Sequence, residues 1–366
     1  HARYGSLPWA RLLQPGITLA REGFEIPADL VAMAQDKIAD VAGDTNFASH
    51  FGNMRTGELF RQPALAATLT RIAADPEDFY RGKTARLLVA QMQRSGGLIT
   101  LRDLADYRAK WRDPLQLTWR NFTVLSAPPP SSGSIALLQL LAPDYLAERA
   151  RGIDALRISA PSAVPPGLES PDTTHFSILD SDGNAVALTY TLNWDFGAGV
   201  VVEGAGFLLN NEMDNFSAKP GVPNAFGVIG NERNAIAPGK RMLSSMTPTV
   251  LLENGRPALV LGTPGGSTIF TSVFQVILNL YDFAMPLQAA VDATRFHHQL
   301  PEAFLLRHDQ RRIDAGVRQD LQDMGYTVVP NDWGDLGDIQ AIQVTARGIE
   351  AAADSRGRGV ARSIDE

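Results

Sequence analysis

The feature that most constrains the fold is a β-hairpin pattern that follows a proline-rich stretch. Residues 175–179 and 185–192 have the composition of two strands, and the polar residues 180–184 between them supply a turn. The preceding residues 157–167 contain prolines and show neither helical nor strand periodicity. The pattern predicts that a pair of antiparallel strands begins near Thr173, directly after an irregular segment.

Thr173 lies at this junction, at the first position of the first strand. If the bond between Asp172 and Thr173 were cut, Thr173 would begin a new chain, and its α-amino group could activate its own hydroxyl. Many threonines begin strands because of β propensity or capping. The local pattern alone leaves both interpretations open.

Composition excludes several other classes of protein. With 366 residues, 45% hydrophobic and 20% charged, the chain is globular and long enough for one large α/β domain or two ordinary ones. A net charge of −7 and the lack of basic runs favour neither nucleic acid nor an anionic membrane as a partner. The absence of cysteine excludes disulfides, thiolate metal sites and a cysteine nucleophile. No apolar run of about 18 residues predicts a membrane span, and no signal-peptide pattern follows His1, so we expect a processed or truncated start.

Periodicity predicts mainly helices in the first part of the chain and strands with glycine-rich loops after Thr173. Locally paired strands with helices packed outside them favour a layered α/β sandwich with mainly antiparallel sheets. Thr100 and Asp103 form a variant of the capping box. The predicted helices cover residues 27–41, 63–74, 84–93, 100–105, 135–141, 270–283, 286–294 and 317–324, and the further strands 115–119, 122–125, 249–252, 258–261, 326–329, 339–344 and 348–352.

Three further segments carry candidate chemistry. Gly265 and Gly266 follow a predicted strand and open a helix, where free N–H groups can form an oxyanion hole; a simple tight turn is the alternative. Ser244 and Ser245 could bind a carboxylate, or belong to an ordinary polar loop. The acidic loop 210–215 could anchor an ammonium group or be solvated, and its spacing does not match a calcium loop.

Metal and hydrolase motifs find no support. His297 and His298 are adjacent, so on a strand they point to opposite faces and do not chelate one metal well. We therefore interpret both as structural. The zinc-protease and α/β-hydrolase motifs do not occur.

Taken together, the segments resemble the γ-glutamyltransferase (γ-glutamyl transpeptidase) family of N-terminal nucleophile hydrolases. The resemblance implies a four-layer αββα sandwich with two stacked, mainly antiparallel sheets. It also implies one precursor cut into a large-subunit portion, residues 1–172, and a small subunit, residues 173–366, which together form one structural domain. The matching segments are 97–104, 128–133, 172–177, 182–193, 206–214, 243–249 and 264–267.

The resemblance also implies a set of site residues. In the catalytic set, Thr173 is the nucleophile, Thr191 hydrogen-bonds it, and Gly265 and Gly266 form the oxyanion hole. In the substrate-binding set, Ser244 and Ser245 hold the α-carboxylate of the donor, and Asn193 and Glu212 hold its α-amine. The substrate-binding residues are Asn193, Glu212, Asn215, Ser244 and Ser245.

The implied activity is that of a γ-glutamyltransferase or glutathione hydrolase. It passes a γ-glutamyl group from glutathione or another γ-glutamyl compound to water, an amino acid or a peptide. The resemblance implies neither a cofactor nor a metal, and it implies a periplasmic or secreted location. The start of the chain aligns with the middle of the family's large subunit, so we expect it to be incomplete there and near residues 141–143.

Departures from the family pattern keep two alternatives open. Asn215 stands where the family usually has an aspartate, which favours acyl groups without an amine, as in glutaryl or cephalosporin acylases. Phe226 replaces a tyrosine of some members in the predicted lid loop 218–227, and the large Trp194 follows Asn193. The second alternative is an inactive, truncated relative with a binding or structural role.

Overall fold

A computed structural model describes residues 1–151, 172–222, 230–299, 304–309, 313–332 and 334–364. They form two compact units, His1–Trp111 with Trp194–Asn211, and Arg112–Asn193 with Glu212–Glu366. The predicted linker 157–167 and Phe226 of the predicted lid loop lie outside the described residues. The predicted subunit boundary between residues 172 and 173 falls inside the second unit and stays a prediction.

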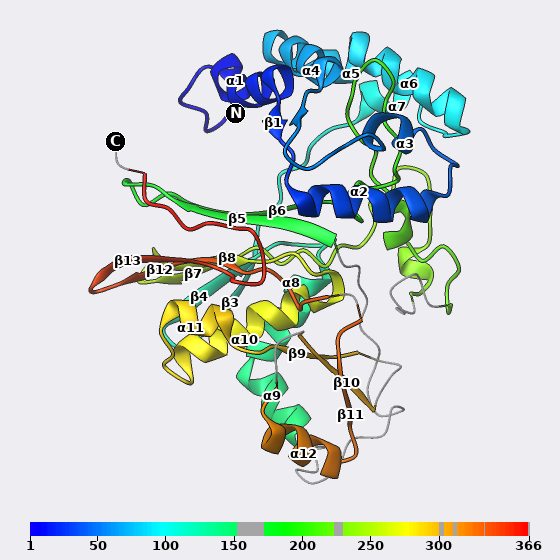
Figure 1. Cartoon of the computed structure of the whole chain (residues 1–366). Coiled ribbons are helices and arrows are strands. Elements are labelled where there is room, and N and C mark those ends of the chain that lie inside the picture. Colours follow the sequence, from blue (N-terminus) through cyan, green and yellow to red (C-terminus); the bar gives the residue numbers. More distant parts are fainter. Residues whose placement is uncertain (152–171, 223–229, 300–303, 310–312, 333, 365–366) are drawn as a thin grey trace. The chain divides into compact units, whose positions relative to one another are not determined.

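The first unit is mainly helical, with one short antiparallel strand pair (Figure 1). The predicted helix at 63–74 has those bounds and begins at a proline, whose missing N–H is not needed in a first turn. The helix predicted at 84–93 ends at Ser95 and is followed by Gly96, whose left-handed backbone (φ 70°) suits glycine. Its elements are α1 (Trp9–Glu22), β1 (Phe24–Glu25), α2 (Ala28–Val41), α3 (Phe47–Phe51), β2 (Leu59–Phe60), α4 (Pro63–Ala74), α5 (Asp78–Arg81), α6 (Lys83–Ser95) and α7 (Leu101–Asp106).

The capping box predicted at the start of α7 is confirmed. The Thr100 hydroxyl accepts from the backbone N–H of Asp103 at 3.3 Å, and the Asp103 carboxylate accepts from the N–H of Thr100 at 2.8 Å. Each side chain thus satisfies one N–H group that the first turn leaves unpaired.

A loop from the later part of the chain completes the first unit. Residues 194–211 pack there with Val202 and Ala205 fully buried. The Asn46 side chain holds this loop, donating to the Val201 carbonyl and accepting from its N–H, both at 2.9 Å. The chain therefore leaves the second unit after Asn193 and returns to it at Glu212.

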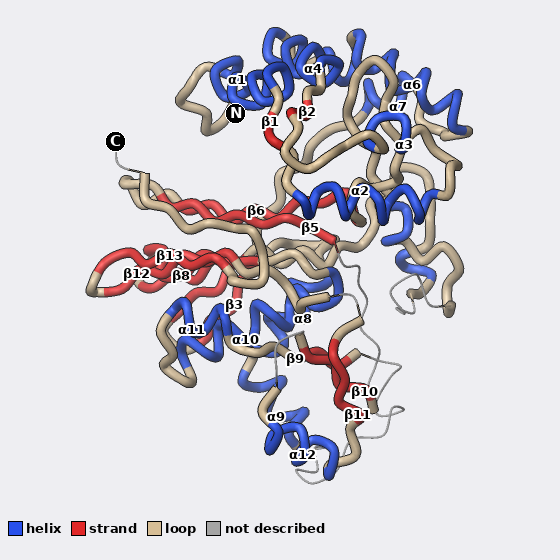
Figure 2. The backbone as a smooth tube through the Cα atoms, in the orientation of Figure 1, coloured by secondary structure: helices blue, strands red, loops and turns tan. Residues whose placement is uncertain are grey.

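The second unit contains a six-stranded antiparallel sheet with the order β13-β12-β8-β7-β4-β3. The main hydrophobic core lies between one face of this sheet and helices α8, α10 and α11 (Figure 2). The strands are β3 (Leu115–Trp119), β4 (Phe122–Ser126), β7 (Thr249–Glu253), β8 (Arg256–Gly262), β12 (Gln340–Thr345) and β13 (Gly348–Ala353), and the helices α8 (Ser132–Leu141), α10 (Ile269–Tyr281) and α11 (Leu287–Asp292).

The predicted hairpin forms a second sheet against the other face of the first. Strands β5 (Asp172–Leu179) and β6 (Ala185–Asn193) pair antiparallel and contact β8, while β5 also contacts β12. This confirms the prediction of two stacked, mainly antiparallel sheets with flanking helices. It also gives the hairpin one face toward the first sheet and one face away from it.

A smaller three-stranded sheet completes the second unit. Its order is β11-β10-β9, and β10 pairs parallel with β11. His297 on β9 is buried and His298 is exposed, which confirms that they point to opposite faces. The remaining elements are α9 (Pro143–Ala150), the short 3-10 helices η2 (Glu212–Asn215), η3 (Glu232–Asn234) and η4 (Gly266–Thr268), β9 (Phe296–His298), β10 (Leu305–His308), α12 (Ala315–Asp323) and β11 (Thr327–Pro330).

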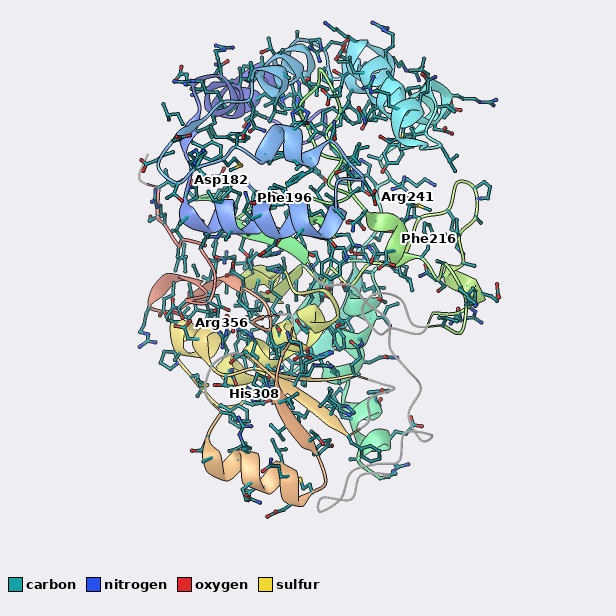
Figure 3. The ribbon with its side chains drawn as sticks, turned by 45° about the vertical axis from the view of Figure 1, so that its right-hand side comes forward. Asp182, Phe196, Phe216, Arg241, His308 and Arg356 are labelled. Carbon is teal, nitrogen blue, oxygen red and sulfur yellow. The ribbon has the colours of Figure 1, made fainter. Side chains whose placement is uncertain are left out.

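Four buried charged side chains join distant segments of the second unit. Arg295 pairs with Asp354 and Arg356 with Asp309, each at 2.5 Å. Figure 3 labels Arg356. Arg295 also donates to the Leu336 carbonyl at 2.6 Å. The pairing offsets the cost of burying the charges, and it fixes the loop that precedes β12. No described helix in either unit has the length and apolar character needed to cross a bilayer.

Candidate active site

The inward face of the β5–β6 hairpin is polar. Thr173, His175 and Ser177 alternate along β5 on the side that faces the six-stranded sheet, and the intervening side chains are exposed. On β6, Thr189, Thr191 and Asn193 share this inward face. Because side chains alternate along a strand, Thr173 and Thr191 therefore lie on the same side of the hairpin.

The register brings these two threonines close along the strands as well. Asp172 pairs with Asn193 and Thr174 with Tyr190, so a bulge places Thr173 opposite residues 191–192. A bulge of this kind redirects a side chain at the end of a ladder. The predicted nucleophile and its predicted hydrogen-bonding partner are thus neighbours in the second unit.

The His175 side chain lies between this end of the hairpin and strand β8 of the six-stranded sheet. One ring nitrogen, Nδ1, lies 2.8 Å from Thr189 Oγ1, and the other, Nε2, lies 3.1 Å from Ser177 Oγ. The Ser177 hydroxyl in turn donates to the Gln340 carbonyl of β12 at 3.1 Å. Burial lowers the pKa of His175 to about 3, so the ring is neutral at physiological pH and links the two sheets.

The turn that contains Gly265 and Gly266, here called the glycine turn, follows β8, the strand that the His175 ring contacts. The His175 ring packs directly on Gly262, the last residue of β8, where a Cβ atom would overlap it. Gly265 and Gly266 come next, with left-handed φ values of 131° and 57°, and Gly266 begins η4 and the helical segment that continues as α10. The first N–H groups of a helix have no partner within it, so the geometry is compatible with an oxyanion hole.

The glycine turn is supported from behind. Gly265 packs against Gly337, and the Thr268 hydroxyl donates to the Gly265 carbonyl at 2.8 Å. The Thr263 hydroxyl oxygen accepts from the N–H of Asp338 at 2.7 Å. The loop that precedes β12, which Arg295 holds through the Leu336 carbonyl, therefore packs against the glycine turn through Gly337 and Asp338.

Ser244 and Ser245 lie in the irregular segment that leads into β7. The N–H of Ser244 donates to the Pro130 carbonyl, and its own carbonyl accepts from the N–H of Ser132, both at 2.9 Å. Ser245 is buried. Two segments far apart in the sequence are thus held together by a short parallel bridge between Ser131 and Ser244.

The acidic loop forms a compact turn in η2. The Asn215 side-chain amide donates to a Glu212 carboxylate oxygen at 2.6 Å. Burial raises the pKa of Glu212 above its usual range, and the hydrogen bond from Asn215 partly offsets this. Asn193 is almost fully buried, with a left-handed φ of 81°, and its N–H donates to Thr191 Oγ1 at 2.7 Å.

Asn234 is a buried residue that the sequence motifs did not indicate. Its amide nitrogen donates to the Asn215 carbonyl at 2.7 Å, and its oxygen accepts from the N–H of Leu243 at 3.1 Å. It therefore connects the acidic loop to the residue before Ser244. The only signal in the sequence is that Asn234 lies between two predicted site segments, the acidic loop and the serine pair.

The second unit contains all nine predicted site residues, in two connected groups. One group comprises the inward face of the hairpin and, through His175 and Gly262, the glycine turn. The other comprises the acidic loop and the serine segment, joined by Asn234. Together the two groups supply a hydroxyl, candidate N–H donors, and serine and acidic side chains, which are the kinds of group that a small polar site uses.

Comparisons with known proteins place the chain in one family. The family model described as gamma-glutamyltranspeptidase matches residues 1–142 and 136–364. The glutathione hydrolase proenzyme of Pseudomonas aeruginosa is 49% identical over 98% of this chain and 74% of its own length.

Two solved structures are also similar. Gamma-glutamyltranspeptidase from Pseudomonas nitroreducens complexed with L-DON is 59% identical with a TM-score of 0.51, over 52% of this chain and all of the solved one. Cephalosporin acylase from Bacillus halodurans is 26% identical with a TM-score of 0.85, over 99% of this chain and 76% of that one. The predicted fold class is confirmed, and the chain belongs to the γ-glutamyltranspeptidase family.

Proposed function

We propose that this chain is a self-processing γ-glutamyltransferase, or glutathione hydrolase, whose nucleophile is Thr173. The observation that carries the proposal is the position of Thr173 at the start of β5, on the inward face with Thr191 and two residues before His175, which contacts the strand leading to the glycine turn. The P. aeruginosa relative is named a proenzyme. The 194 residues from Thr173 to Glu366 are 53% of the chain, close to the 52% that covers the whole solved P. nitroreducens chain.

The proposed chemistry begins with hydrolysis of the peptide bond between Asp172 and Thr173: water supplies the hydroxyl of the new Asp172 carboxyl group and a hydrogen to the nitrogen, which becomes the free α-amino group of Thr173. That amine has an ordinary pKa of about 8, so near neutral pH an appreciable fraction can accept a proton. The Thr173 oxygen attacks the γ-glutamyl carbonyl carbon, its proton passes through the amine to the leaving group, and the C–N bond breaks. Water or the amine of an acceptor then attacks the resulting ester and releases Thr173.

The other predicted residues fit the charges of this reaction. The N–H groups of Gly265 and Gly266 would stabilise the oxyanion of the tetrahedral intermediate. Ser244 and Ser245 would hold the α-carboxylate of the donor, and Asn193, Glu212 and Asn215 its α-amine. Because Glu212 binds an ammonium group only when ionised, its raised pKa predicts that donor binding weakens on acidification earlier than an exposed carboxylate would allow.

The decisive experiment is the substitution Thr173→Ala. We expect it to abolish both the appearance of two fragments on denaturing gels and the release of p-nitroaniline from γ-glutamyl-p-nitroanilide. Thr174→Ala is the matched control, because this threonine points to the exposed side of the hairpin, and it should retain both activities. N-terminal sequencing of the smaller wild-type fragment should give Thr-Thr-His-Phe; a Thr173→Ala protein that still splits would refute the assignment.

A second candidate, an acylase for amine-free acyl groups, is favoured by one observation. Asn215 is a neutral amide that already donates to Glu212, which reduces the negative charge available for a donor ammonium group. The similar fold of the B. halodurans cephalosporin acylase is compatible with this reading. Rates on γ-glutamyl- and glutaryl-p-nitroanilide separate the two: a clear preference for glutaryl supports the acylase. A single uncut band without amidase activity supports an inactive relative.

The cellular setting is part of the same proposal. We propose a periplasmic or secreted enzyme that takes glutathione or other γ-glutamyl compounds and uses water, amino acids or peptides as acceptors. Two chains from one precursor would form the active protein.

A further inference from the structure

The backbone of the segment that carries Ser244 and Ser245 is fixed by a series of hydrogen bonds that takes no part in the proposed reaction. Residues 245–248 belong to no helix or strand that the structure describes. Nevertheless, the five consecutive backbone carbonyls of residues 244–248 each accept a hydrogen bond. The donors, in order, are the N–H of Ser132 (2.9 Å) and the hydroxyls of Thr247 (2.7 Å), Ser131 (2.8 Å), Thr249 (3.0 Å) and Ser126 (3.0 Å).

The four donor hydroxyls are buried. Thr247 and Thr249 are inaccessible to solvent, and Ser126 and Ser131 are 3% and 5% exposed. A backbone carbonyl that loses its partner in such a place cannot turn to water, so it keeps the full cost of desolvation. The segment therefore has one well-satisfied conformation, and each lost hydroxyl favours a shift of the backbone.

Two of these hydroxyls act on the serine pair at short range. The Thr247 hydroxyl donates to the carbonyl of Ser245 itself, and the Ser131 hydroxyl donates to the next carbonyl, that of Met246. The Ser131 oxygen also accepts from the N–H of Ser134 and so caps helix α8. Ser131 thereby ties the serine pair to a helix of the main core.

Close packing excludes a simple alternative position for this segment. Gly133 lies against the Ser245 carbonyl and the Thr247 hydroxyl, and a Cβ atom at Gly133 would overlap both. Ser131 and Gly133 belong to the part of the chain before Thr173, whereas Ser245 and Thr247 belong to the part after it. The contact would therefore persist across the cut as a contact between the two proposed subunits.

We propose that Ser131 and Thr247 are positioning residues that set donor selectivity by fixing the hydroxyls of Ser244 and Ser245 for the donor α-carboxylate. The inference rests on the proposed function, in which these serines bind that carboxylate. It assigns to the proline- and serine-rich segment 128–133 a task in substrate recognition. Neither residue needs to touch the donor for this effect.

The test uses three p-nitroanilide donors that separate the carboxylate from the amine. The γ-glutamyl donor carries both groups, the glutaryl donor only the carboxylate, and the 4-aminobutanoyl donor only the amine. Thr247→Val keeps the shape but removes the hydroxyl, Thr247→Ser keeps the hydroxyl, and Ser131→Ala removes the second hydroxyl. Thr345→Ala is the control, because its hydroxyl also donates to a backbone carbonyl, that of Gly348, but in the β12–β13 turn.

We expect Thr247→Val and Ser131→Ala to raise KM about tenfold for the γ-glutamyl and glutaryl donors, the effect of losing about 1.4 kcal/mol of binding. kcat/KM for 4-aminobutanoyl should change less than twofold, Thr247→Ser should restore the wild-type KM, and Thr345→Ala should leave all three donors unaffected. An equal loss for all three donors, or no loss for any, would overturn the positioning role. Wild-type turnover of the γ-glutamyl donor, measured alongside, tests the proposed function separately.

Discussion

At the residue scale, the carboxyl group of Asp338, in the loop that packs against the glycine turn, makes the stability of the folded chain depend on pH. Its N–H donates to Thr263, while its carboxylate accepts from Gln340 at 2.9 Å. Burial, together with the negative charge of Asp354, raises the pKa of Asp338 from 3.8 to about 6. A carboxyl group with a higher pKa in the folded chain binds more protons when folded. Its contribution to stability therefore decreases as the pH rises from about 4 to about 6.

Asp338→Asn removes this ionisation but keeps an acceptor for Gln340. A pKa difference of about two units corresponds to about 3 kcal/mol for a fully buried group, and solvent screening at this partly exposed carboxyl reduces it to about 1 kcal/mol. We expect the variant to be more stable than the wild type by about that amount above pH 7, with the difference shrinking toward zero near pH 4. Urea unfolding across this range measures it, and a pH-independent difference would contradict the explanation.

At the scale of elements, the contact between β5 and β8 depends on one glycine. His175 packs on Gly262 and cannot easily turn aside, because both of its ring nitrogens are engaged by hydroxyls of the hairpin. The distance between the two sheets at this point is therefore set by a side chain on one and the lack of a side chain on the other.

Gly262→Ala should displace the hairpin from β8. Overpacking of this kind typically costs about 1–3 kcal/mol, and because Thr173 lies two residues from His175, we expect both cleavage and kcat to decrease more than donor KM increases. Gly16→Ala is the control, since a Cβ there would make only ordinary contact, with Leu69 at 3.6 Å. If the Gly262→Ala variant kept the cleavage and kcat of the wild type, the predicted displacement of the hairpin from β8 would be contradicted.

The same scale shows what the sequence could predict. The helix at α4 and the strand β3 have their predicted bounds, because apolar spacing and a favourable proline agree there. Helix α1 was not predicted, since it contains Pro15, which normally interrupts a helix. Strands β9 and β10 were also missed: they are three and four residues long, and β10 pairs in parallel with a distant strand.

The site likewise contains residues that the sequence could predict and residues that it could not. The predicted residues lie in local motifs, and the strand alternation that places Thr173 and Thr191 on one face is itself a sequence property. The supporting contacts of His175, Asn234 and Ser131 join segments that are distant in the chain, so spacing carries no signal for them. Their roles become visible only when the segments are brought together.

At the scale of the whole molecule, the proposed cut divides the chain but not the core of the second unit. Strands β3 and β4 precede Thr173, yet β4 pairs with β7 along five residue pairs in the middle of the six-stranded sheet. Trp119, Phe122 and Leu137 from before the cut share one buried cluster with Leu259 and Ile277 from after it. Separating the two products would expose this cluster and an open sheet edge.

We therefore expect the processed protein to remain one particle. After complete cleavage, both fragments should elute together on size exclusion under native conditions, at the volume of the uncut Thr173→Ala protein, and separate only in denaturant. The uncut protein controls for shape, because scission at a single bond leaves the paired strands in place. Two native peaks would mean that the β4–β7 pairing and the shared core are too weak to replace the covalent link, and would require a larger rearrangement on cleavage than this structure allows.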